Sequence, residues 1–180
     1  MYIDNGAFGK HPFTLKEDAP DEIQIWQAQM SLWIEQDMAV AIARCNEERA
    51  SELAKQGKSD HLWVAYLPVS CLIRLSIDNK LGKGGGSNLM SDGFAISFTG
   101  IQNDDKMFMV PLALDLVVEE ASVMRLLDKI CGVGFYTPIG VSYRAIKANP
   151  LQEDFIYGDQ PVVQLRIELE AYYVRKIFEP

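Results

Sequence analysis

Histidine is scarce in this chain, which holds only His11 and His61 among its 180 residues. Acid–base catalysis and zinc binding both rely heavily on histidine, and these two residues have no spacing that zinc motifs use. Paired carboxylates are present, but Glu119-Glu120 falls where negative charge stabilises the start of a helix. The sequence therefore predicts no catalytic residue, no metal site and no cofactor.

Cysteine is equally sparse. Cys45, Cys71 and Cys131 match no zinc or redox spacing, and their odd number argues against a secreted domain held together by disulfides. The simplest expectation is three small, buried, apolar side chains. One disulfide beside one free thiol is the alternative.

An excess of positive charge is also missing. The 25 acidic residues outnumber the 17 basic ones and give a formal net charge of −8. Binding to nucleic acid and charge-driven docking on anionic lipid are therefore disfavoured. The sequence has no run of about 18 apolar residues and no signal peptide at its start, so we expect no membrane insertion by this chain.

What the sequence does contain is a clear succession of hydrophobic periods, in a composition that is 48% hydrophobic and typical of a globular domain. Residues 1–20 show no hydrophobic periodicity, and we expect them to form an extended or poorly ordered lead-in. Residues 21–55 have helical spacing, and residues 62–178 predict an α+β sheet domain. The helix would reach ~50 Å at 1.5 Å per residue. Because a small sheet needs less, we expect either a break near Asn46 or packing against something outside the domain.

The sheet domain divides into short alternating segments. Strands are predicted at Leu62–Leu67, Ser70–Lys80, Gly93–Thr99, Met109–Val118, Ile139–Lys147 and Val162–Arg175, and a helix at Glu119–Cys131. The second and third strands indicate a hairpin with a long loop. The last strand alternates Val163, Leu165, Ile167 and Leu169 with Gln164, Arg166, Glu168 and Glu170. This alternation predicts an antiparallel sheet with one solvated face.

Five residues are candidates for a protein interface. Trp26 and Trp33 are seven residues apart on one helical face, with Met30 between them, and Tyr172 and Tyr173 point to opposite faces of the last strand. Aromatic side chains dominate interface hot spots. Core packing is the plainer interpretation of the two tryptophans.

A glycine-rich run, Lys83, Gly84, Gly85, Gly86 and Ser87, is the candidate ligand-binding segment. Successive glycine N–H groups can cradle an anion, and the chain would then be a small-ligand- or phosphate-binding protein or an enzyme. A P-loop needs its lysine after the glycines and a helix behind them. Here the lysine comes first and a strand pattern follows, so a flexible hairpin loop is the preferred interpretation.

The segment VPLALDLVVEEASVMRLLDKICGV, followed by the strands YRAIK and VVQLRIELEAYYV, resembles the periplasmic domain of PilO, an alignment protein of type IV pilus assembly, and of GspM, its type II secretion counterpart. The resemblance implies a small ferredoxin-like domain behind a membrane anchor and a coiled helix. It also implies a non-enzymatic assembly module that dimerises and binds neighbouring assembly proteins.

The expected fold class is therefore α+β, with an antiparallel sheet that is ferredoxin-like in its C-terminal half and follows a long amphipathic helix. The expected partners are proteins, including a second copy of the chain in a homodimer. The compartment would be periplasmic for a fragment of an anchored assembly protein and cytoplasmic otherwise.

Overall fold

The computed structural model describes residues 1–8, 22–58, 63–78, 106–146, 157 and 160–174. In chain order its elements are β1 (Tyr2–Ile3), α1 (Glu22–Lys55), the 3-10 helix η2 (Val64–Tyr66), β2 (Val69–Ile77), β3 (Met107–Glu119), the 3-10 helix η4 (Glu120–Ser122), α2 (Val123–Cys131), β4 (Tyr136–Ala145) and β5 (Val162–Val174).

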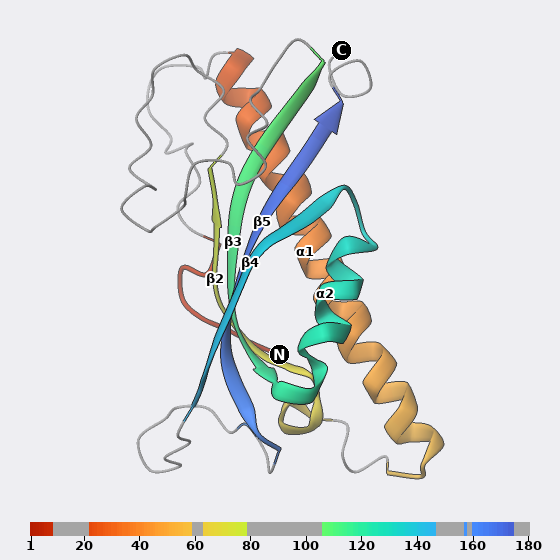
Figure 1. Ribbon diagram of the computed structural model, residues 1–180. Helices are drawn as coiled ribbons and strands as arrows, with labels where there is room; N and C mark the ends of the chain where they lie inside the picture. Colours follow the sequence, from red (N-terminus) through yellow and green to blue (C-terminus); the bar gives the residue numbers. More distant parts are fainter. Residues whose placement is uncertain (9–21, 59–62, 79–105, 147–156, 158–159, 175–180) are drawn as a thin grey trace.

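The strands form one sheet in the order β1-β2-β3-β5-β4. β1 runs parallel to β2, and the other neighbours are antiparallel. Both helices cover the same side of this sheet (Figure 1). The α+β prediction is confirmed, with a mixed sheet in place of a wholly antiparallel one.

The centre of the sheet is the pairing of β3 with β5. Leu112, Leu114, Leu116 and Val118 on β3 lie opposite Leu169, Ile167, Leu165 and Val163 on β5, and none of these eight is more than 3% exposed. The predicted core faces of both strands are thus confirmed. Burying each leucine or isoleucine of this kind stabilises the fold by about 1.5–3 kcal/mol.

The opposite face of the sheet carries the polar side chains of β5 and a small apolar cluster of Cys71, Val117 and Val162. One polar residue of β5 differs from the prediction. Arg166 Nη1 lies 3.1 Å from Asp115 Oδ2, and its Nε lies 3.3 Å from Glu168 Oε1. Glu170, which the alternation predicts to be solvated, is completely buried. Tyr172 lies two residues further along the same face, and its hydroxyl donates a hydrogen bond to the Glu170 carboxylate. The buried carboxylate therefore has a hydrogen-bond partner.

Helix α1 is continuous through Asn46, so the first of the two alternatives for this helix, a break near Asn46, is wrong. The Asn46 side chain accepts a hydrogen bond from Val69 N at 2.9 Å and donates one to Val69 O at 3.1 Å, which fixes the helix to the start of β2. The core side of α1 carries Met30, Ile34, Met38, Ala41, Ile42 and Cys45, all buried. Other apolar residues of the helix, Ile25, Leu32 and Val40, are exposed.

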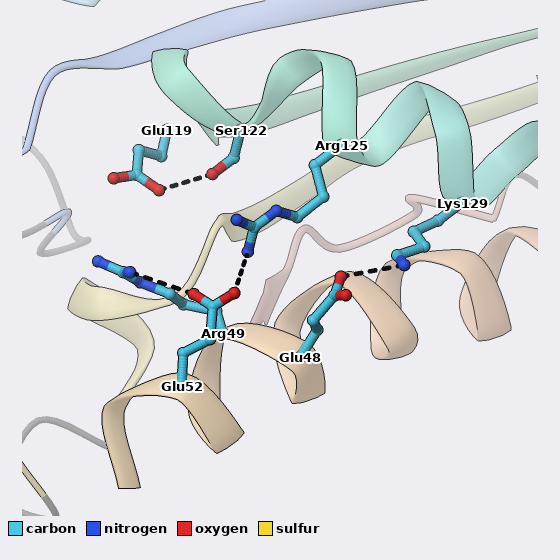
Figure 2. Close-up of polar contacts among 7 residues, drawn as sticks. All are labelled: Glu48, Arg49, Glu52, Glu119, Ser122, Arg125 and Lys129. Carbon is cyan, nitrogen blue, oxygen red and sulfur yellow. Dashed lines mark hydrogen bonds and ion pairs between the residues drawn. The ribbon is translucent and has the colours of Figure 1, made fainter. Parts of the chain in front are cut away.

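Charged side chains join α1 to α2 (Figure 2). Lys129 Nζ lies 3.0 Å from Glu48 Oε2, and Arg125 Nη1 lies 3.4 Å from Glu52 Oε1. The hydrogen bond with Lys129 holds the pKa of Glu48 below its ordinary value. The partners are four residues apart on each helix, so the two pairs match in register. Exposed ion pairs contribute only about 0–1 kcal/mol each, and hence these fix how α2 lies on α1 more than they stabilise it.

One predicted segment differs from the structure, one agrees with it in part, and one lies outside the described residues. The residues expected as a strand at Leu62–Leu67 contain the 3-10 helix Val64–Tyr66, because the period of so short an apolar run does not separate strand from helix. The lead-in is ordered at its start, where β1 pairs with Cys71 and Leu72. The hairpin strand Gly93–Thr99 lies outside the described residues.

We expect Asn46→Ala to lower the free energy of unfolding by about 1–3 kcal/mol, because both polar groups of Val69 lose their side-chain partner. Urea denaturation followed by circular dichroism measures the change. Glu47→Ala, at the exposed neighbouring position, is the control and should stay within about 0.5 kcal/mol of wild type. Equal effects of the two substitutions would contradict the anchoring role of Asn46.

Candidate functional site

Four of the five predicted interface residues gather where α1 crosses β3 and β5. The Trp26 and Trp33 rings meet edge to face at 5.7 Å, and Trp33 lies 6.3 Å from the Tyr173 ring. Met30 is fully buried and Tyr173 is 7% exposed. In this conformation those two residues belong to the core and offer almost no area to a partner.

Trp26, Trp33 and Tyr172 keep part of their surface exposed. Both tryptophans pack against the core from its margin, which agrees with the plainer interpretation of the pair. The interface role of these residues stays a prediction.

The same region contains a cleft of about 340 Å³, which we call the aromatic cleft. Its lining comes from α1, from the turn between α2 and β4, and from the ends of β4 and β5, and consists of Trp33, Gln36, Asp37, Val133, Gly134, Phe135, Tyr136, Ala171, Tyr172 and Tyr173. A second hollow of about 620 Å³ shares four of these residues, Gly134, Phe135, Tyr136 and Tyr172. Sites of this size and apolar character are typical of ligand-binding clefts.

A hydrogen bond between α1 and β4 gives the cleft its polar group. The Tyr136 hydroxyl donates to Asp37 Oδ2 at 2.7 Å. Burial, helped by this carboxylate, raises the pKa of Tyr136 far above its ordinary value, and burial also raises the pKa of Tyr173 to about 12. Both rings are therefore neutral phenols at physiological pH, and Tyr136 is a permanent donor to Asp37.

Gly134 allows this arrangement. A Cβ atom at this position would lie 2.7 Å from Tyr136 Cε2 and 3.4 Å from Asp37 Oδ2, and the first distance is too short for two carbon atoms. Gly132 caps the C-terminus of α2, and Gly134 allows Tyr136 and Asp37 to pack closely.

Sequence reasoning did not identify Asp37, Gly134, Phe135 and Tyr136 as members of one site. The available signal was the run Gly134-Phe135-Tyr136, where two aromatic residues follow a glycine directly after a helix. Asp37 gave no signal, because the residue lies 99 positions from its partner Tyr136.

The predicted ligand-binding run Lys83, Gly84, Gly85, Gly86 and Ser87 lies outside the described residues, as do both histidines. Within the described ranges, no group of three or more His, Cys, Asp or Glu side chains is placed to hold a metal ion. None of the described helices is both long and apolar enough to span a membrane.

Comparisons with protein-family models, with curated proteins and with solved structures gave no match. The resemblance to PilO and GspM therefore stays a prediction.

Removing the Tyr136 hydroxyl should destabilise the fold. We expect Tyr136→Phe to lower the free energy of unfolding by about 1–2 kcal/mol. The reason is the loss of the hydrogen bond from the Tyr136 hydroxyl to the Asp37 carboxylate. Tyr143→Phe, the same change at a 60% exposed position of β4, should be nearly neutral. Thermal and urea denaturation of the two variants measure the difference. Equal stabilities would show that the hydrogen bond between Tyr136 and Asp37 does not stabilise the fold.

The three thiols should differ in reactivity. Cys45 and Cys71 are buried, and burial raises the pKa of Cys45 to about 11 and raises that of Cys71 as well. Cys131 is exposed, which corrects the expectation of three buried cysteines. Since the thiolate is the reactive form, a disulfide reagent should modify one thiol quickly in the native protein and three after denaturation. Cys131→Ser should abolish the fast phase, and a fast phase that persists in this variant would contradict the assignment.

Proposed function

We propose that this chain is a non-enzymatic protein-interaction module that pairs with a second copy of itself along the edge strand β4. The observation that carries the proposal is a set of exposed apolar side chains on and beside this strand. Met124 is 74% exposed, Phe135 75%, Val141 43% and Tyr143 60%. Single exposed apolar residues are ordinary, but Val141 and Tyr143 lie on the same face of one strand, and contiguous apolar surface is typical of interaction sites.

Two of these residues lie on the helix-bearing face of the sheet, but no part of the described chain buries them. Val141 lies opposite Ile167 and Tyr143 opposite Leu165 in the pairing of β4 with β5. Residues directly opposite one another share a face of the sheet, and both partners on β5 are completely buried. Val141 and Tyr143 thus point to the side that bears the helices, where a second copy would bury them.

The backbone of β4 supports the same conclusion. β4 is the last strand of the sheet, and no described strand pairs with its outer edge. A free edge is a template for another strand, and backbone hydrogen bonds across it give affinity. A register shift lies between Pro138 and Gly140, and so the second half of β4 is the more regular template.

Charge also favours this strand. The chain as a whole carries a net charge of −8, which makes two copies repel one another. The ten residues of β4, YTPIGVSYRA, include no acidic side chain and one basic one, Arg144. The repulsion between two copies is therefore weakest where their β4 strands meet.

The order of elements agrees with the resemblance to alignment proteins of pilus and secretion systems. β3 and β4 run in the same direction with β5 between them, and α2 connects them. We interpret this as the split βαβ unit of ferredoxin-like sheets. On this interpretation α1-β2-β3 and α2-β4-β5 are two helix–strand–strand halves, and each half begins with its helix. A role in the assembly of a larger machine follows as part of the proposal.

Sedimentation equilibrium over a wide concentration range tests the pairing. We expect a reversible wild-type dimer whose dissociation constant rises by at least ~10-fold in Tyr143→Glu, because a buried charge at an interface costs several kcal/mol. The thermal unfolding of the variant monomer should match that of wild type, since Tyr143 is exposed there.

Leu32→Glu is the matched control, because Leu32 is an exposed apolar residue of α1 and is 43% exposed. It should leave the dimer intact. A monomer at every wild-type concentration would refute homodimerisation. A dimer that Leu32→Glu disrupts and Tyr143→Glu does not would move the interface from β4 to α1. Trp33→Ala is unsuitable for this test, since Trp33 also packs on the core.

A further inference from the structure

The aromatic cleft combines ring surfaces with a single charged group. Trp33, Phe135, Tyr136 and Tyr173 line it with aromatic side chains, of which Tyr136 and Tyr173 are 6% and 7% exposed and Phe135 is 75% exposed, and Asp37 is the one carboxylate among its lining residues. The Tyr172 ring points to the other face of the sheet, where its hydroxyl bonds Glu170. None of the described residues that line the cleft or the hollow beside it is Lys, Arg or His. The site therefore offers several π-systems and one negative charge, with no described cation to neutralise them.

We propose that the aromatic cleft binds a methylated ammonium group. Ring faces attract cations electrostatically, and quaternary ammonium ions are the ligands that cages of aromatic residues recognise. A net charge of −8 adds a general attraction for cations.

The scarcity of acceptors selects this class of cation over a simple amine. A primary ammonium carries three donors and is strongly hydrated, so the site would have to replace several hydrogen bonds with water. Asp37 Oδ2 accepts a hydrogen bond from the Tyr136 hydroxyl, so part of the acceptor capacity of the single carboxylate in the lining is already used. A quaternary ammonium has no N–H group and needs only rings and a nearby negative charge, both of which the cleft supplies.

The walls of the cleft are held in place before any ligand arrives. The Trp33 ring is supported by Trp26 at 5.7 Å and by Tyr173 at 6.3 Å. The Tyr136 ring is fixed by its bond to Asp37 and by close contact with Gly134. Rigid walls reduce the entropy lost on binding. Phe135, 75% exposed at the margin of the same cleft, is the wall residue with most area left for a ligand to cover.

The cleft is formed within one chain, and Val141 and Tyr143 are not among the residues that line either hollow. Phe135 belongs both to the cleft and to the apolar surface proposed for the dimer, so the two proposals are tested separately with a variant that cannot pair. The monomeric variant Tyr143→Glu should accordingly bind the same ligands as wild type, which keeps a failure of one proposal distinct from a failure of the other.

The test is isothermal titration calorimetry of the full chain with choline chloride and with 3,3-dimethylbutan-1-ol, its uncharged carbon isostere. We expect choline to bind at least ~10-fold more tightly than the isostere, because only choline gains the cation–π attraction. Equal affinities, or no binding of any methylated ammonium probe, would overturn the proposal.

Two variants locate the binding. Asp37→Asn keeps an acceptor for the Tyr136 hydroxyl and removes the charge, while Phe135→Leu keeps an apolar side chain and removes the ring. Each should weaken choline binding by roughly 5- to 10-fold. Phe135→Leu should do so at an unchanged melting temperature, because Phe135 is exposed. Asp37→Asn should also lower the melting temperature, because the Tyr136 hydroxyl exchanges a charged acceptor for a neutral one. Wild-type affinity in both variants would place the binding elsewhere and overturn the assignment to the cleft.

A pair of peptides distinguishes the source of the group. One carries a trimethylated lysine and the other an unmodified lysine at the same position. Methylated-peptide binding no tighter than that of choline would support a free small molecule as the source, and methylated-peptide binding at least ~10-fold tighter than that of choline would support a modified protein. Equal binding of the two peptides would contradict selectivity for methylated ammonium.

Discussion

The unequal length of the two helices is the constraint on which the rest of this structure depends. α1 has 34 residues and α2 has nine, which correspond to about 51 Å and 14 Å of helix. β4, with ten residues, extends about 33 Å and is far longer than the helix beside it. The start of β4 is therefore buried at Tyr136, whereas Val141 and Tyr143 stay exposed. The same mismatch leaves the turn before β4 open as the wall of the aromatic cleft.

The hydrogen bond from Tyr136 to Asp37 holds the start of β4 against α1. It joins α1 to β4 across 99 residues of sequence, on the side where the short helix α2 ends. The ion pairs of Glu48 and Glu52 with Lys129 and Arg125 orient α2 from its other flank. The cleft is therefore bounded by contacts that are specific in geometry, while the bulk of the stability comes from the leucine and isoleucine layer under α1.

The elements with a strong period could be predicted from the sequence. The alternation in β3 and β5 is unbroken over many residues, and the helical stripe from Met30 to Cys45 marks the core side of α1. Short segments could not, because the run at Leu62–Leu67 has too few residues to show a period, and the pairing of Tyr2 and Ile3 with β2 is a tertiary contact. The cleft was hidden for the same reason: Asp37 and Gly134 are ordinary residues until the fold brings them against Tyr136. The buried Glu170 likewise follows the polar phase of its strand, and only the packing around it decides its burial.

The two edges of the sheet differ, because residues 2–7 pair with the edge at β2 and no described strand pairs with the edge at β4. β1 pairs with Cys71 and Leu72, and Ala7 O then accepts a hydrogen bond from Leu75 N at 2.7 Å, so this stretch of the β2 edge is already occupied. An assembly in which β4 of one copy joined β2 of the next would be heterologous and would continue into a filament. Residues 2–7 of the same chain already fill part of that edge, so the proposed pairing of one β4 with another, which closes at two copies, would meet less competition from open-ended assembly. In the proposed dimer, β1 would therefore protect the β2 edge against polymerisation.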